Sequence, residues 1–315
     1  MTPVQALLTT ELPEESFELD KPLAPLTYFK IGGPAEAFLK ITSEEQLKRV
    51  LTVCTQHQIH YTIVGGASNV LVSDAGLQGL VLQITANAIA QVDKQIVEAQ
   101  AGIKTALLVS RTVQLGFTGL EYFLGVPGTL GGAVYNNAHY LSQLIDSDIH
   151  KVYAIAPDGT GTWYNHADCE FAYEHSRFQQ SKEIIWSVQF KLEPGDAQTS
   201  KDLITKATQY RAKTQPLGIP SSGCIFQNVP NTPELQELFP QFAEATHVPG
   251  GFIIDQAGLK GMSEGDISVS EKHAAWMINQ GQGTATQVKT LISRVKKAVA
   301  DKFGIQLQEE VFFLE

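Results

Sequence analysis

The sequence predicts an α+β fold in at least two parts. Helical and strand-like segments alternate in the first half, short strands separated by turn residues follow, and longer helices dominate from Ser200 onward. With 315 residues the chain can bury a full core and is long enough for two or three domains. The change of character in LEPGDAQTSKD (192–202) predicts a domain boundary there.

A strand–helix–strand unit is expected first, in EAFLKITSEEQLKRVLTVCTQHQIHYTIVGG (36–66). Thr42 and Glu45 fit a capping box at the start of the helix. The side chains expected on the buried face of that helix are Leu47, Val50, Leu51 and Cys54. Residues 61–64, 79–85 and 95–102 are predicted strands, and residues 104–115 a helix ended by Gly116.

The second half begins with two predicted strands, KVYAIAPDG (151–159) and EIIWSVQFKLEPGD (183–196). Near the end, an apolar stripe at helical spacing predicts an amphipathic helix that stops at Gly304. The stripe consists of Val288, Leu291, Ile292, Val295 and Val299. A last strand is expected in IQLQEEVFFL (305–314).

Composition limits the function classes. A net charge of −10 disfavours nonspecific binding to nucleic acid, so no nucleic-acid partner is expected. No apolar run reaches the roughly 18 residues of a membrane span, and no signal peptide is visible, so a cytoplasmic protein without a membrane partner is expected. Cys54, Cys169 and Cys224 lack metal-site spacing, which predicts free thiols in a reducing compartment and no metal site.

Two glycine-rich loops are the candidate ligand site. The first, Gly-Gly-Ala-Ser-Asn at residues 65–69, directly follows a predicted strand, where backbone N–H groups can point at an anion. The second is GLEYFLGVPGTLGGAVYNNA (119–138). Neither loop has the Walker or the Rossmann glycine spacing. From the residues alone two interpretations stay open: tight turns that pack strand on strand, or loops that hold a flat or charged ligand.

Further motifs, read with the two loops, carry a family resemblance. They are TYFKIGGPAEAF (27–38), YEHSRF (173–178), RAKTQPLGIPSSGCIFQN (211–228), IIDQAGLKGMSEGDISVSEKHAAWMIN (253–279) and FGIQLQEEVFFLE (303–315). In this order, and over about residues 26–315, the chain resembles the UDP-N-acetylenolpyruvoylglucosamine reductase family. The resemblance implies an N-terminal arm (1–25) and a two-part FAD-binding domain of the vanillyl-alcohol oxidase type (26–195, split near residue 66). It also implies a C-terminal α+β substrate-binding domain (196–315) whose final strand returns to the active site.

By this resemblance the chain is a monomeric flavoprotein oxidoreductase of peptidoglycan precursor synthesis. It would use FAD and NADPH to reduce UDP-N-acetylglucosamine enolpyruvate to UDP-N-acetylmuramate. The hydride would come from flavin N5, and the proton from a serine or cysteine at the position of Cys224.

The resemblance also assigns site residues. Cys224 and Glu310 would be catalytic, and Tyr173, Asn228 and His273 would contact the nucleotide sugar. Residues alone favour a buried hydrophobic role for Cys224 and a solvated edge carboxylate for Glu310. The FAD-binding residues would be Gly65, Gly66, Ala67, Ser68 and Asn69 at the pyrophosphate, and Val126, Pro127, Gly128, Gly131, Gly132, Asn137, Ala138 and Val188 along the rest of the cofactor.

One departure from the family pattern lies at Glu174, where the family has an arginine near the substrate carboxylate. A carboxylate there opposes enolate formation unless it points away or is protonated. Arg177 and Lys213 are candidate replacement cations; alternatively, Glu174 faces solvent and Glu310 stabilises the enolate together with backbone N–H groups. Thr214 likewise stands where the family often has lysine. Two other functions stay open, namely another FAD oxidoreductase of this cofactor-domain type, or a catalytically impaired flavin- or nucleotide-sugar-binding homologue.

Overall fold

The computed structural model describes residues 1–141 and 143–315. The chain forms two compact units, each assembled from three segments. Unit 1 comprises Met1–Lys21, Ala35–Gly66 and Gln78–Lys213, and unit 2 comprises Pro22–Pro34, Ala67–Leu77 and Thr214–Glu315. The domain boundaries that the sequence predicts near residues 25, 66 and 195 remain predictions. No helix within the described ranges is long and apolar enough to cross a membrane.

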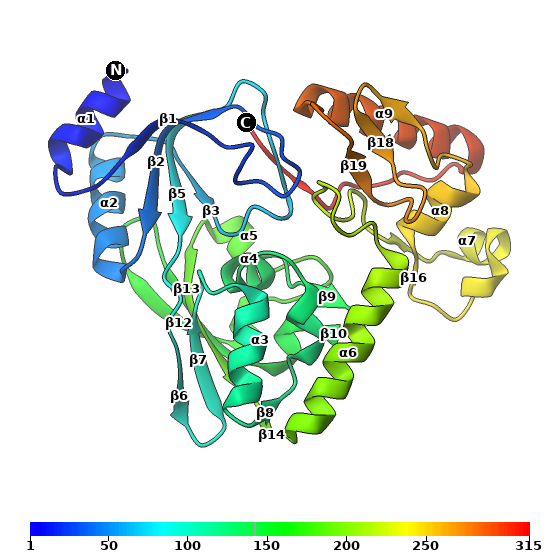
Figure 1. The fold of residues 1–315 in the computed structure, drawn as a ribbon, viewed down its shortest axis with the longest axis horizontal. Helices are drawn as coiled ribbons and strands as arrows, with labels where there is room; N and C mark the ends of the chain where they lie inside the picture. The colour runs from blue at the N-terminus through cyan, green and yellow to red at the C-terminus, as the bar shows by residue number, and fades with distance from the viewer. Residues whose placement is uncertain (142) are drawn as a thin grey trace. The chain divides into compact units, whose positions relative to one another are not determined.

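Unit 1 contains a four-stranded sheet in the order β1-β2-β5-β3, in which β3 and β5 are parallel. Helix α2 runs beside this sheet (Figure 1). The side chains expected on its apolar face are buried in the core. The predicted strand–helix–strand unit is therefore confirmed. The bounds are α1 Pro3–Glu11, α2 Glu44–Gln56, β1 Glu18–Pro22, β2 Pro34–Ile41, β3 Tyr61–Val64 and β5 Leu77–Ile84.

The start of α2 differs by one residue from the sequence prediction. Ser43 is the N-cap, because its side chain accepts a hydrogen bond from the backbone N–H of Gln46 at 3.1 Å. Thr42 lies one position outside the helix and donates its own N–H to the Gln46 side chain. The capping box from Thr42 and Glu45 is therefore wrong. Two adjacent hydroxyl residues are each followed three positions later by Glu or Gln, so the pattern fits both registers.

A five-stranded antiparallel sheet in the order β12-β11-β13-β7-β6 forms the rest of the framework of unit 1. Its two long strands, β11 and β13, confirm the strands expected from KVYAIAPDG and EIIWSVQFKLEPGD. The helix expected at residues 104–115 is also confirmed, as α3. The bounds are β6 Ile89–Asp93, β7 Ile96–Gln100, β11 Ile149–Ile155, β12 Gly161–Asn165, β13 Ile184–Lys191, α3 Thr105–Gln114, α4 Leu130–Tyr135, α5 Phe178–Ser181 and α6 Ala197–Thr214.

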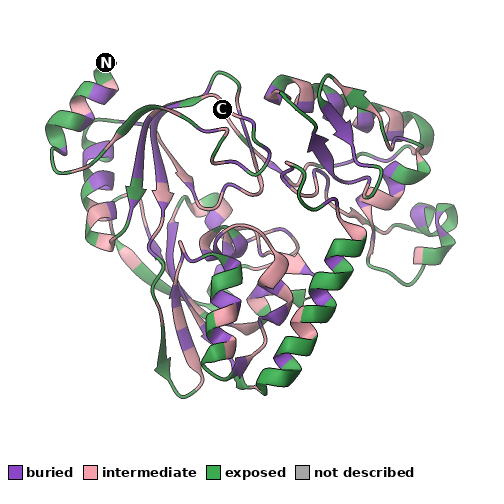
Figure 2. Ribbon diagram, in the orientation of Figure 1, coloured by how far each residue is buried: buried purple, intermediate pink, exposed green. Residues whose placement is uncertain are grey.

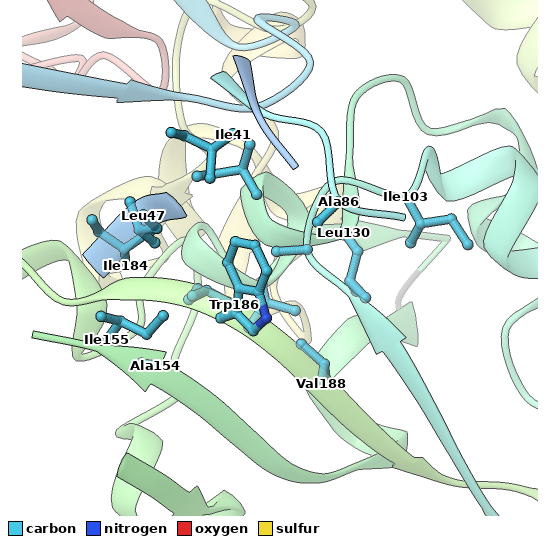
Figure 3. Packing of buried hydrophobic residues seen from close by; sticks show 14 of the residues in the cluster. Ile41, Leu47, Ala86, Ile103, Leu130, Ala154, Ile155, Ile184, Trp186 and Val188 are labelled. Atoms are coloured by element: carbon cyan, nitrogen blue, oxygen red, sulfur yellow. The ribbon is translucent and has the colours of Figure 1, made fainter. Parts of the chain in front are cut away.

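One apolar core fills unit 1. It joins α2, the strands of both sheets and α4, and Figure 3 shows part of it, with Trp186 and Val188 of β13 close to Leu130 of α4. Helix α6, by contrast, is mostly exposed along its length (Figure 2). Short two-stranded pairs complete the unit, with bounds β8 Phe117–Thr118, β14 Glu193–Pro194, β9 His139–Tyr140 and β10 Gln143–Leu144.

Unit 2 has its own core, built around helix α9 and a three-stranded antiparallel sheet, β17-β18-β19 (Figure 1). The whole predicted apolar stripe of α9 is buried, and Gly304 ends the helix with φ 70°. The bounds are α7 Pro233–Leu238, α8 Gly250–Gln256, α9 Ala285–Phe303, β15 Val229–Pro230, β16 His247–Val248, β17 Ser263–Glu264, β18 Ile267–Val269 and β19 Met277–Asn279.

The last strand of the chain is shorter than expected. Only β20, Phe312–Leu314, is a strand, and it pairs in parallel with β4, Val70–Val72. The side chains of Ile305, Leu307 and Val311 are buried, but Phe313 is 38% exposed. The prediction of a strand over the whole of residues 305–314 is therefore wrong, and only its last part is a strand. An apolar run that packs without forming a continuous ladder cannot be distinguished from a strand by its periodicity.

Candidate functional site

The two glycine-rich loops meet in unit 1 with their backbones in close contact. A Cβ on Gly66 would lie 2.5 Å from the Cα of Gly128, and a Cβ on Gly65 would overlap the Thr129 hydroxyl. Gly128 has φ 109°, which L-residues rarely adopt. Only glycine therefore permits this approach of the Gly65–Gly66 backbone to Gly128–Thr129.

The second loop is fixed to the segment that precedes α3. Leu130 and Gly131 donate backbone hydrogen bonds to Ile103 and Ala101, at 2.9 and 2.8 Å. The Thr129 hydroxyl, beside Gly65, is buried and has no hydrogen-bond partner among the described residues. A buried hydroxyl normally has a partner. Close backbones, small residues and one unmatched hydroxyl fit a phosphate-bearing cofactor such as FAD.

The remaining predicted FAD residues differ in what they contact. Val126 and Pro127 are half-buried, as is Ser68. Ala67 has φ 50° and accepts a backbone hydrogen bond from Tyr28. The Ala138 N–H bonds to the Ala133 carbonyl at 2.7 Å.

Three other predicted FAD residues are engaged with protein groups. Asn137 is buried, and its side chain donates to the Ala172 carbonyl and accepts from the N–H of Asp146. Asn69, in unit 2, donates its amide to the Glu310 carbonyl at 3.3 Å. Val188 is fully buried in the core of unit 1 (Figure 3). On the neighbouring strands it is paired with Ala99 and Val152.

Glu174 lies in a tight turn whose ends, Ala172 and His175, exchange backbone hydrogen bonds. It has φ 52°, a left-handed conformation that costs a non-glycine residue roughly 1–2 kcal/mol. Its side chain is only 3% exposed, so the alternative that Glu174 faces solvent is wrong. Non-glycine residues persist in this conformation where surrounding contacts fix them, often at functional sites.

Two side chains fix the Glu174 carboxylate. One oxygen lies 2.8 Å from Nδ1 of His139, and the other accepts from the Asn136 amide. The His139 ring lies against Tyr173, with centroids 5.2 Å apart. The turn therefore brings Tyr173 and Glu174 to the residues that end the second glycine loop.

Arg177, one of the two candidate replacement cations, is directed elsewhere. Its guanidinium stacks over the Tyr164 ring at 4.1 Å and lies 3.5 Å from a Glu183 oxygen. It also donates to the Asp168 carbonyl. These contacts hold the guanidinium against residues of the five-stranded sheet and its neighbours, and not beside Glu174.

Cys224 and Glu310 lie on adjacent backbone segments in unit 2. The Glu310 N–H donates to the carbonyl of Ile225, the residue after Cys224, at 2.8 Å. On its other side, Cys224 forms a bridge with Trp276. The fold thus joins the predicted acid and the predicted carboxylate, far apart in sequence, through one hydrogen-bonded pair of segments.

Unmatched polar atoms gather around this Cys224 segment. Ser222 Oγ, His273 Nδ1 and Trp276 Nε1 are buried and have no hydrogen-bond partner among the described residues. The His273 and Trp276 rings have centroids 6.3 Å apart. Asn228 follows Cys224 by four residues. Its side-chain oxygen accepts a hydrogen bond from the N–H of Gly250, at the start of α8. Such atoms suit a polar ligand that supplies the missing partners.

Sequence reasoning missed four members of these sites. Ser222 and Trp276 lie inside a recognised motif, yet only burial reveals that their polar atoms are unmatched. Asn136 lies in the second loop and His139 directly follows it, but neither was connected to Glu174, because these contacts join segments more than 30 residues apart. No local pattern signals a pairing of this kind.

Burial lowers the pKa of His273, so its imidazole favours the neutral form in the folded protein. In the unfolded chain the imidazole binds a proton near pH ~6.5. The unfolded state therefore binds more protons below that pH, and the free energy of unfolding falls as the pH drops toward the lower folded pKa. We expect urea unfolding of the wild type to show a steeper loss of stability between pH 7.5 and 5.5 than His273→Gln. Equal slopes would contradict this.

Comparisons with known proteins identify the family. A model of the FAD binding domain matches residues 35–164, and a model of the UDP-N-acetylenolpyruvoylglucosamine reductase C-terminal domain matches residues 215–314. A UDP-N-acetylenolpyruvoylglucosamine reductase from Chlamydia felis is 36% identical over 92% of this chain and 91% of its own length. The chain belongs to the UDP-N-acetylenolpyruvoylglucosamine reductase family. It is a flavoprotein oxidoreductase of peptidoglycan synthesis.

Two further members of the UDP-N-acetylenolpyruvoylglucosamine reductase family agree over nearly the whole chain. The reductase from Caldicellulosiruptor bescii is 34% identical over 95% of this chain and 90% of that protein. The crystal structure of the enzyme from Thermus caldophilus superposes with a TM-score of 0.77 at 27% identity, covering 96% of this chain and 99% of that one. The resemblance, the α+β fold with an FAD-binding domain, and FAD as cofactor are therefore confirmed.

Proposed function

We propose that this chain reduces UDP-N-acetylglucosamine enolpyruvate to UDP-N-acetylmuramate with electrons from NADPH. The observation that carries the proposal is the hydrogen bond from Glu310 to Ile225, because it fixes the Cys224 segment beside that of Glu310. The names of the relatives, each an enolpyruvoylglucosamine reductase, support the substrate.

FAD would be held by the two glycine-rich loops. Backbone N–H groups of Gly65 and Gly66 would face its phosphates, and the Thr129 hydroxyl would give it a hydrogen bond. FAD would supply hydride transfer from NADPH to the enolpyruvyl group. Gly128 and the residues that follow it would shape the wall of the site.

Cys224 would donate the proton in the reduction. A thiol is a stronger acid than a serine hydroxyl, which suits a cysteine to this role. Glu310, whose main chain is tied to Asn69 and Ile225, would hold its carboxylate near the carbon that receives the proton.

The nucleotide sugar would be bound by Tyr173, Asn228 and His273, and we add Ser222 and Trp276. Their unmatched hydroxyl and indole N–H would bond to polar atoms of the substrate. The fixed indole donor in particular favours an oxygen-rich ligand over an apolar one.

NADPH rather than NADH, a monomeric state and a cytoplasmic location complete the proposal. Within the described ranges no disulfide joins the three cysteines, and Cys54 and Cys169 are buried, which suits a reducing compartment. Light scattering of the purified protein tests the monomer. Initial rates with NADPH and with NADH test the electron donor.

The decisive experiment is anaerobic turnover. The purified protein should be yellow and should oxidise NADPH when the enolpyruvyl nucleotide sugar is added, with UDP-N-acetylmuramate detected by mass spectrometry. Lactate and an aryl alcohol, each assayed with an artificial electron acceptor in place of NADPH, serve as controls and should give no turnover. A yellow protein that binds the nucleotide sugar without turnover would indicate a catalytically impaired homologue, and turnover of only the alcohols would indicate another FAD oxidoreductase.

Gly132→Ala separates a cofactor role from a packing role in the second loop. Gly132 is exposed in α4, and a Cβ there would meet no protein atom closer than 4.0 Å. Alanine should therefore stabilise the flavin-free protein by up to about 1 kcal/mol through helix propensity. If FAD lies against this position, its affinity should fall at the same time. Thermal unfolding of the flavin-free protein and fluorescence titration with FAD check both; unchanged FAD affinity would remove Gly132 from the FAD site.

A further inference from the structure

We propose that the buried Glu174 carboxylate and the partly exposed His139 imidazole form an acid–imidazole pair that positions Tyr173 for the nucleotide sugar. His139 is then a positioning residue of this enzyme, and Glu174 anchors it. The inference rests on the proposed function, since it takes Tyr173 as a substrate contact.

Burial of the Glu174 carboxylate is the first step of the argument. A carboxylate that is 3% exposed needs partners that replace its hydration. Within the described ranges His139 Nδ1 lies 2.8 Å from one carboxylate oxygen, a close contact without hydrogen-bond geometry, and the Asn136 amide donates to the other oxygen. Both carboxylate oxygens thus contact neighbouring side chains.

The backbone around Glu174 is fixed to the same region. The Gln179 amide donates to the Glu174 carbonyl at 3.0 Å and to the Tyr135 carbonyl at 3.1 Å. The Ser176 hydroxyl donates to Tyr135 as well, at 2.7 Å. Tyr135 ends α4, so the turn is attached to the helix that the second glycine loop opens.

His139 contacts both Tyr173 and Glu174 of this turn. It follows Ala138, the last residue of the second loop, and lies in β9, opposite Leu144 of β10. Its imidazole contacts Glu174 through Nδ1 and lies at 48° to the Tyr173 ring, 5.2 Å between centroids. Tyr173 is half-buried, so the imidazole limits the positions its ring can take.

The pair also explains why a left-handed Glu174 is retained. The turn conformation directs the side chain inward, where His139 and Asn136 receive it. A glutamate at this place therefore organises the loop and does not present a charge to solvent. Substrate binding should depend on Glu174 and His139 jointly rather than independently.

The test is a pair of double-mutant cycles on the flavin-loaded enzyme. The first combines Glu174→Gln with His139→Gln, and the second combines His139→Gln with Tyr173→Ala. His166→Gln is the matched control, because His166 also pairs with a carboxylate, Asp146 at 3.1 Å, and contacts an aromatic ring, but is exposed. Each variant is assayed for kcat, for KM of the enolpyruvyl nucleotide sugar, for the rate of flavin bleaching by NADPH and for thermal unfolding.

Each single variant of the pair is expected to raise KM for the nucleotide sugar about tenfold, with kcat changed less than about threefold. The double variant Glu174→Gln/His139→Gln should be no worse than either single one, and His139→Gln should add little in the Tyr173→Ala background. Flavin bleaching by NADPH and the His166→Gln control should match the wild type.

The proposal would be overturned if KM for the nucleotide sugar is unchanged in both single variants, or if the KM effects of the single variants simply multiply in both double-mutant cycles. If Glu174→Gln does not fold, the cycle of His139→Gln with Tyr173→Ala decides alone. Wild-type enzyme is assayed first: absence of its turnover would overturn the proposed function and this inference with it, whereas normal wild-type turnover with unaltered variants overturns only the inference.

Discussion

Cys224→Ala is expected to lower turnover of the enolpyruvyl nucleotide sugar by roughly 10²- to 10⁴-fold, the usual contribution of a positioned proton donor. Flavin content and flavin bleaching by NADPH should persist, because Cys224 lies in unit 2 and the contact of the two glycine loops lies in unit 1. Stopped-flow measurement of each half of the reaction checks this.

Cys224→Ser is the matched control for this prediction. A serine keeps an exchangeable proton at the same position but is a weaker acid, so it should retain more turnover than alanine. Turnover of Cys224→Ala at the wild-type rate would remove Cys224 from the mechanism and leave Glu310 or solvent as the donor.

Gly66→Ala is expected to abolish FAD binding and to destabilise unit 1 by about 1–3 kcal/mol, as overpacking does. Its Cβ would lie 2.5 Å from the Cα of Gly128, and a backbone atom cannot rotate aside as a side chain can. The flavin-to-protein absorbance ratio of the purified variant and its urea unfolding curve measure the two effects.

The comparison with Gly132→Ala separates the causes in Gly66→Ala. Both substitutions add one methyl group to a glycine loop, but only the one at Gly66 meets protein atoms at short range. A yellow, wild-type-like Gly66→Ala protein would show that the two loops need not touch for FAD to bind.

Most of the framework could be predicted because its elements carry strong local periodicity. The stripe of α9 and the face of α2 are buried as expected, since an apolar face must be covered wherever the helix packs. The start of α2 and the length of β20 were less predictable. Adjacent hydroxyl residues allow two caps, and strand pairing depends on a distant partner that a local pattern does not contain.

The candidate site, too, could be predicted from the sequence only in part. The glycine loops could be recognised from residue type, because only glycine allows two backbones to approach this closely. The environment of Glu174 could not, since its partners His139 and Asn136 come from another segment and its left-handed backbone directs the carboxylate inward. For the same reason, the contacts of Arg177 with Tyr164 and Glu183 could be found only in the structure.

The parallel pairing of β20 with β4 sets an order of events during synthesis. Next to this pairing, the Asn69 side-chain amide donates a hydrogen bond to the Glu310 carbonyl. These two residues are 241 residues apart in sequence. On the ribosome, Val70–Val72 leaves the exit tunnel long before its partner strand is translated, so this edge waits unpaired while unit 1 can already form. A chaperone that shields exposed strand edges should therefore associate with nascent chains until about residue 312 emerges, and should release them after that point.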